Sequence, residues 1–181
     1  MKKIPLVIIA LIIGLYACNS AGQNEQKEEK ASLEKTIKDL QLKLARQDDV
    51  NKDRETAETL VAQSQLFAKE FPRDSMAAVY LFRAADVSRG LGDFTHAIAL
   101  WGKVNQSFPR FKRAPDALFL QGFTYDRDLQ NTEQAKKHYR LFLEKYPDHP
   151  MVPDVSLMLQ YLEEDKSPEE LIKEFKDKSG Q

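Results

Sequence analysis

The chain has 181 residues, of which 42% are hydrophobic and 30% are charged, and its formal net charge is −1. This balance is typical of a globular protein with room for one domain and its appendages, and the mixing of basic with acidic residues excludes the basic stripe that nucleic-acid binding requires. Only seven glycines occur, and β-branched runs are scarce after Ile13, so we expect an all-α body.

The N-terminal segment has the parts of an export signal. Residues 1–17 begin with Lys2 and Lys3 and continue in an apolar stretch from Ile4 to Leu15. This stretch is shorter than the roughly 20 apolar residues that a transmembrane helix needs. It therefore predicts a cleaved signal peptide, with an uncleaved anchor and a plain secretory signal as the alternatives.

The single cysteine of the chain follows this segment directly. The run Leu15-Tyr16-Ala17-Cys18 resembles the lipobox of bacterial lipoproteins, although Tyr16 replaces the small residue usual at that position. The resemblance implies that the signal is removed before Cys18 and that Cys18 carries the lipid. It also implies that Asn19, in enteric-type bacteria, directs the protein to the outer membrane. We therefore expect a lipid anchor in the outer membrane and a body that faces the periplasm, with the leaflet left open.

Two segments are predicted between the lipid and the repeats. Residues 18–30 hold Cys18 and a polar run, which predicts a flexible linker. Residues 31–47 predict an amphipathic helix, because four apolar residues follow one another at spacings of four, three and four. These residues are Leu33, Ile37, Leu40 and Leu44. Two heptads are short for a coiled coil, so the helix is expected either to pack onto the first repeat or to form a homo-oligomer through residues 33–44.

An aromatic residue followed by proline recurs three times, every 37 to 38 residues, as Phe71-Pro72, Phe108-Pro109 and Tyr146-Pro147. A fixed period of this length predicts a solenoid of helical hairpins, here over residues 53–178. The predicted helices are Met76 to Arg89, Asp93 to Ser107, Ala114 to Asp128, Thr132 to Tyr146, Pro153 to Glu163 and a last helix from Ser167.

Start signals agree with these boundaries. Pro115 and Pro153 lie where a first helical turn tolerates proline. Asp93 follows a glycine-containing breaker, and Asn131 precedes Gln134 by three residues, as in a capping box.

The hairpins resemble the tetratricopeptide repeat, which places small residues where paired helices touch, an aromatic residue on the second helix and a closing proline. The residues that match are Leu81, Ala85, Ala97, Trp101 and Pro109 in one copy and Leu118, Gly122, Tyr125, Ala135, Tyr139 and Pro147 in the next. The aromatic-proline ending followed by Ala114-Pro115-Asp116 is similar to periplasmic repeats of the Tol-Pal-associated YbgF (CpoB) family and of the BamD lipoprotein family of barrel assembly.

This resemblance implies a protein-protein interaction scaffold in cell-envelope assembly or maintenance, with Tol-Pal coordination of the YbgF type as the main expectation. A BamD-like role in outer-membrane protein assembly and a self-associating structural coiled-coil lipoprotein are the alternatives. Glycan capture is a third, which the absence of a pocket-forming insertion disfavours.

The resemblance further implies a concave surface lined by the first helix of each hairpin. On that register the expected partner-binding residues are Phe82, Asp86, Arg89, Phe119, Phe123, Asp126, Arg127 and Tyr161. Aromatic rings beside charged residues suit an extended peptide or a helix lying in a groove. The alternative for Phe82 and Phe119 is a place in the core between neighbouring repeats.

The sequence carries no pattern typical of catalysis. Its three histidines, His96, His138 and His149, are scattered, and none has the spacing or the cysteine partners of a zinc site. The glycines Gly90 and Gly92 lie between two predicted helices, whereas a phosphate-binding loop follows a strand. We expect no enzyme activity, no cofactor, no metal and no nucleic-acid partner.

Overall fold

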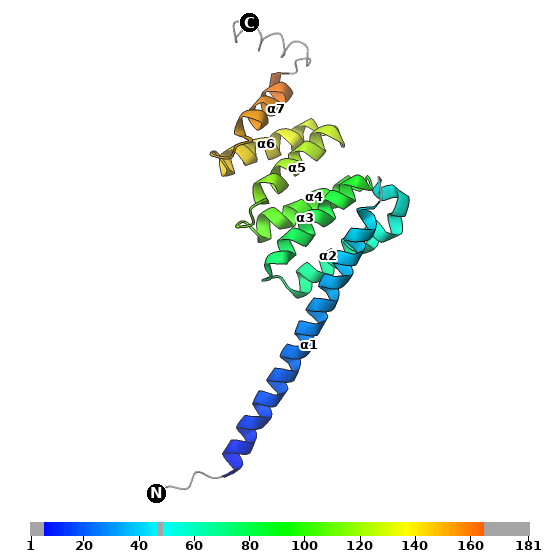
Figure 1. Cartoon of the computed structure of the whole chain (residues 1–181). Helices are drawn as coiled ribbons and strands as arrows, with labels where there is room; N and C mark the ends of the chain where they lie inside the picture. The colour runs from blue at the N-terminus through cyan, green and yellow to red at the C-terminus, as the bar shows by residue number, and fades with distance from the viewer. Residues whose placement is uncertain (1–5, 47–48, 165–181) are drawn as a thin grey trace.

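The structure, a computed structural model, describes residues 6–46 and 49–164, with side chains from Gln23 onward. This part of the chain contains α-helices, one 3-10 helix and no strand. The elements are α1 Leu6–Leu44, η1 Val50–Asp53, α2 Arg54–Glu70, α3 Ser75–Gly90, α4 Phe94–Ser107, α5 Ala114–Arg127, α6 Thr132–Lys145 and α7 Val152–Glu164. Each helix packs chiefly against the next one in sequence (Figure 1). The expected all-α solenoid of helical hairpins is thereby confirmed.

The boundaries of α3 to α7 agree with the predicted ones to within one or two residues. Side chains cap the helix starts as expected for aspartate and asparagine: Asp93 accepts a hydrogen bond from the backbone N–H of His96 at 3.2 Å, and Asn131 accepts one from Gln134 at 3.1 Å. Helix α5 has no side-chain cap and instead carries Pro115 in its first turn. The last predicted helix, from Ser167, lies outside the described residues.

The aromatic-proline pairs end three helices in the same way. Phe71, Phe108 and Tyr146 have φ between −123° and −133° and ψ near 57°. Each backbone carbonyl then accepts a hydrogen bond from the residue three positions on, at 3.0, 2.9 and 3.1 Å. The following proline excludes the helical conformation of the residue before it, so the sequence repeat produces one turn three times.

The turns inside the hairpins differ from each other. Gly92 has φ 80° between α3 and α4, whereas Gln130 has φ 51° between α5 and α6. Glycine adopts this left-handed region readily, and a residue with a side chain does so at a cost. The later turn is one residue longer in sequence, which is where the two copies diverge.

Helix α1 is longer than expected. Gln23 to Lys30 are helical in the structure, although the polar composition predicted a flexible linker there. The reason is that Gln, Glu and Lys are good helix formers, and Lys30 Nζ lies 2.5 Å from the Asp74 carboxylate, which ties this stretch to the start of α3.

The apolar seam of α1 lies in the core of the chain itself. Leu33, Ile37 and Leu44 are buried together with Ala57 and Leu60 of α2, and Leu40 packs at the edge. Of the two expectations for this helix, packing onto the first repeat is the one that the structure contains.

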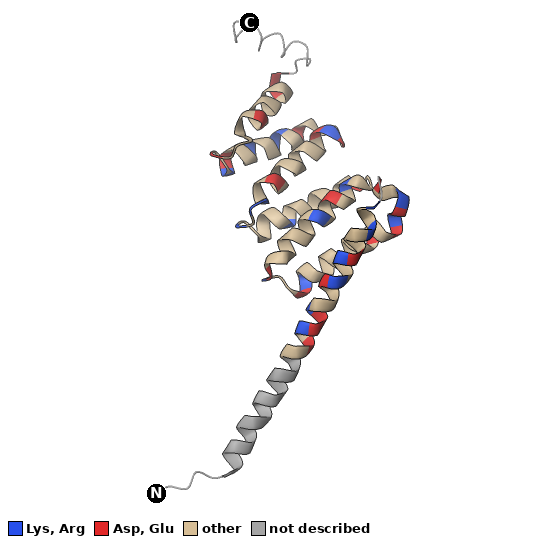
Figure 2. Cartoon of the chain, viewed as in Figure 1, with Lys and Arg blue, Asp and Glu red and all other residues tan. Residues whose placement is uncertain are grey.

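Two further apolar clusters continue the core along the solenoid, one over α2 to α5 and one over α5 to α7. Phe108 packs against both the cluster that includes α1 and the cluster over α2 to α5, so these two parts of the core are continuous. Residues with charges of both signs are interspersed along the described part of the chain (Figure 2). Among the described helices, none has the length and apolar composition needed to cross a membrane.

Candidate functional site

Side chains bridge α3 and α5, the first helices of successive hairpins. Arg89 near the end of α3 donates two hydrogen bonds to Asp128, from Nε at 2.7 Å and from Nη2 at 3.2 Å. At the other end, the guanidinium carbon of Arg113 lies 3.8 Å from the centre of the Phe82 ring. A bidentate ion pair and a cation–π contact therefore hold the two helices in register.

A pocket of about 610 Å³ lies beside the Arg89–Asp128 bridge, and we call it the α3–α5 groove. It is lined by Asn51, Asp86, Arg89, Gly90, Leu91, Gly92, Phe94, Trp101, Leu120 and Asp128. Trp101 comes from α4, behind the two bridged helices, and is only 1% exposed. The groove thus combines charged side chains from α3 and α5 with apolar side chains from α4 and α5.

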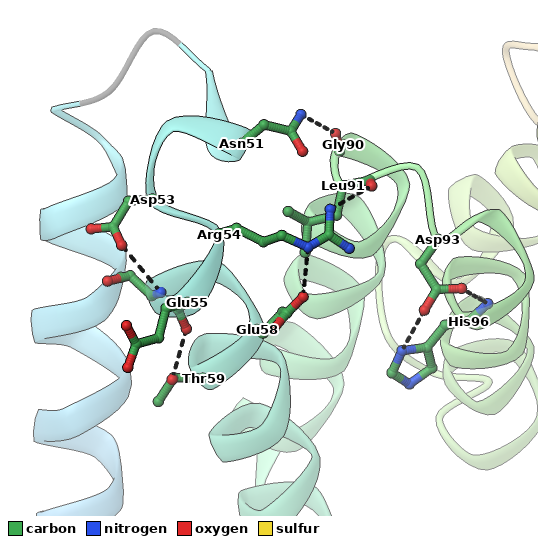
Figure 3. A network of polar contacts seen from close by, with 11 residues as sticks. Asn51, Asp53, Arg54, Glu55, Glu58, Thr59, Gly90, Leu91, Asp93 and His96 are labelled. Atoms are coloured by element: carbon green, nitrogen blue, oxygen red, sulfur yellow. Dashed lines mark hydrogen bonds and ion pairs between the residues drawn. The ribbon is translucent and has the colours of Figure 1, made fainter.

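Polar side chains of η1 and of the start of α2 contact the turn between α3 and α4 (Figure 3). Asn51 of η1 donates from Nδ2 to the Gly90 carbonyl at 3.2 Å, and Arg54 donates from Nη1 to the Leu91 carbonyl at 3.5 Å. Arg54 is itself held by Glu58 at 2.7 Å. These contacts fix the turn between α3 and α4, whose glycines and Leu91 line the groove.

Asp86, which lines the groove, has a raised pKa. Although it is among the exposed residues of α3, loss of water around its carboxyl raises its pKa to about 6. Arg113, the indole N–H of Trp101, Arg89 and Arg83 oppose this rise because they favour the ionised form. The carboxyl forms no ion pair within the described structure.

The structure brings some of the expected partner-binding residues together. Asp86 and Arg89 both line the groove. Phe123 is half-buried, and the guanidinium carbon of Arg89 lies 5.2 Å from the centre of its ring. Arg127 is 55% exposed at the end of α5, so its side chain is open to solvent.

Asp126 is engaged in contacts within the chain. Its side chain is 10% exposed, lies 3.2 Å from Arg127 Nε and accepts a hydrogen bond from the Tyr139 hydroxyl at 3.4 Å. Burial, and then the charge of Asp126, raise the pKa of the Tyr139 phenol well above its usual range. Asp126 therefore connects α5 to α6 and does not line the groove.

Phe82 does not present its ring to solvent, which favours the alternative for this residue, a place in the core between neighbouring repeats. It is 1% exposed because Trp101, Phe111 and Arg113 surround the ring. Phe119 is half-buried and packs against Tyr139 and Phe142.

Two other expected residues lie away from the groove or beyond description. Tyr161 is half-buried on α7 and does not line the groove. Cys18, the expected lipidation residue, lies outside the residues whose side chains are described.

Sequence reasoning missed the residues that complete the groove. Trp101 matches the aromatic position on the second helix of the repeat, and nothing in the sequence pattern indicates that it also lines a pocket. Leu120 and Asp128 were not singled out, although the extra residue after α5 marked the place where the copies diverge. Within the described part of the chain, no group of histidine, cysteine, aspartate or glutamate side chains is placed to hold a metal ion.

Comparison with known proteins agrees with the hairpin geometry. Residues 116–149 match the family model of the tetratricopeptide repeat. The matched span covers most of α5, all of α6 and the aromatic-proline turn that follows. No curated protein sequence matches the chain significantly.

Proposed function

We propose that this protein is a scaffold that holds segments of partner proteins in the α3–α5 groove. The observation that carries the proposal is the groove itself, which opens between the first helices of two successive hairpins and mixes charged with apolar lining. Tetratricopeptide repeats, which residues 116–149 match, are typically non-catalytic modules that bind other proteins. Anchors of aromatic and apolar type supply most of the affinity in such interfaces.

Site-specific photocrosslinking tests this proposal. A photoreactive amino acid at Leu120, in the groove, is expected to capture a partner in cells, whereas the same amino acid at Leu66, which is 38% exposed on α2 outside the groove, is not. The double substitution Phe123→Ala/Arg127→Glu should weaken the capture at Leu120. Equal capture at both positions, or none at Leu120, would contradict a partner site in the groove.

We also propose a place for the scaffold, in the periplasm and anchored to the outer membrane by lipid on Cys18. The support is the sequence of residues 1–18, with its two lysines, its apolar stretch and its lipobox-like end. Metabolic labelling with a radioactive fatty acid should mark the wild-type protein and not Cys18→Ser. Labelling of both proteins alike would contradict lipidation at this residue.

Within the envelope, we propose a role in assembly or maintenance of the YbgF type, with BamD-like barrel assembly as the alternative. Identification of the crosslinked partner distinguishes the two. Self-association through residues 33–44 has less support, because Ile37 is fully buried in the chain's own core and Leu33 and Leu44 are nearly so.

A further inference from the structure

We propose that the α3–α5 groove recognises a basic side chain, lysine or arginine, of the partner segment, and that Asp86 is the residue that pairs with it. This inference rests on the proposed scaffold function. The starting observation is that Asp86 has no ion pair within the described structure, while it lines the groove beside aromatic and apolar side chains.

The cations around Asp86 are each engaged elsewhere. Arg89 is held by Asp128 in a bidentate pair, and Arg83 donates to Gln41 of α1 at 3.0 Å. Arg113 pairs with Asp116 at 2.9 Å and covers the Phe82 ring. Asp86 is therefore the carboxylate in the groove that lacks a counter-ion in contact.

Trp101, beside Asp86, adds a second observation. Its buried indole N–H has no hydrogen-bond partner among the described residues, although it lies near enough to Asp86 to favour the ionised carboxyl. Buried polar groups of proteins normally have a hydrogen-bond partner, so the indole N–H of Trp101 is an exception in the lining of the groove. A bound cation that draws the carboxyl into its ionised form also favours the hydrogen bond from Trp101.

Charge and shape favour a cation over an anion. Arg89 and Asp128 neutralise each other, so the uncompensated charge of the groove is the carboxylate of Asp86, which would repel an anionic group of a partner. A lysine or arginine stem instead has apolar surface to follow, from Phe94 and Leu120, before its charged end reaches Asp86. The pairing of opposite charges then selects the partner.

The only tryptophan of the chain gives a direct readout. The full-length protein, labelled with ¹⁵N in the indole and held in a neutral detergent, is titrated with acetyl-Gly-Gly-Lys-Gly-Gly-amide or with the matched norleucine peptide. The lysine peptide should shift the single indole resonance in a concentration-dependent manner, with a dissociation constant of roughly millimolar or weaker, because one ion pair contributes little binding free energy. The norleucine peptide should leave the resonance unchanged.

Two variants test the assignment to Asp86. Asp86→Asn should weaken the binding of the lysine peptide by about two- to fivefold. Asp148→Asn, which removes an exposed carboxylate of the turn after α6, should bind as the wild type does. Equal response to both peptides, tighter binding of a glutamate peptide, or unchanged affinity of Asp86→Asn would overturn the inference.

Failure of the basic-residue inference can be distinguished from failure of the proposed scaffold function. Capture of a partner at Leu120 that persists unchanged in Asp86→Asn refutes the basic-residue inference and leaves the scaffold standing. Absence of any capture at Leu120 in the wild type counts against the scaffold, whatever the peptides do.

Discussion

Replacing Gly122 of α5 by alanine should destabilise the protein, although alanine is the better helix former. A Cβ atom at Gly122 would lie 2.8 and 2.9 Å from two ring carbons of Tyr139 and 3.1 Å from Cβ of His138. Tyr139 is fully buried, so its ring has little room to move. Overpacking of this kind costs about 1–3 kcal/mol, and these contacts place the cost near the upper end.

The gain in helix propensity offsets about 1 kcal/mol of this cost, so the net loss is about 2 kcal/mol. For a chain of this size that loss lowers the melting temperature by roughly 4–8 °C, measured by far-ultraviolet circular dichroism. Gly102→Ala is the matched control, because a Cβ there meets only Gln121 Oε1 at 3.5 Å. It should stabilise the protein by up to about 1 kcal/mol. A Gly122→Ala protein that melts at or above the wild-type temperature would refute the argument.

Three further substitutions are expected to have defined effects. Asn105→Leu should lower the free energy of unfolding by about 2 kcal/mol, measured by chemical denaturation. The reason is that buried Asn105 donates to the Ala114 carbonyl and to the Tyr146 hydroxyl and accepts from Lys145, and leucine leaves these groups unpaired. A loss no larger than a few tenths of a kcal/mol would argue against this role. Burial is the main cause that lowers the pKa of His138 below 6.5, so stability is lost as pH falls below that unfolded-state value, and His138→Gln should flatten this part of the profile of melting temperature against pH. The pKa of Asp86 is raised from 3.8 to about 6, so the wild type loses stability as pH rises between these values. The variant Asp86→Asn should therefore be more stable than the wild type by on the order of 1 kcal/mol at pH 7, after allowance for solvent screening, and equally stable near pH 3. An equal gain in stability at both pH values would contradict the pKa argument.

The solenoid could be predicted from the sequence because its signals are local. Proline after Phe71 and Phe108 disfavours the helical conformation of the residue before it, and Asp93 and Asn131 cap helices through bonds that span three residues. These signals operate without knowledge of the rest of the fold, so the helix boundaries followed closely.

The groove could be predicted only in part, because it depends on contacts between repeats. The register placed Asp86 and Arg89 on the face that lines the groove, but the same register put Phe82 there, and the burial of Phe82 depends on Arg113 and Phe111 from the next loop. Asp128 lies 39 residues beyond Arg89, at the start of the turn in which the copies diverge. Its pairing could not be read from the repeat.

Helix α1 has a mechanical consequence. Its residues from Leu33 onward are locked into the first hairpin, while the helix continues back to Leu6. With the proposed cleavage before Cys18, and at 1.5 Å per residue, the part from Cys18 to Leu33 is a rod of about 22 Å. A flexible strand would transmit only tension between its ends, whereas a rod that is clamped at one end also transmits bending and twist. Whatever holds the N-terminal end of α1 therefore sets the direction in which the α3–α5 groove faces as well as its distance.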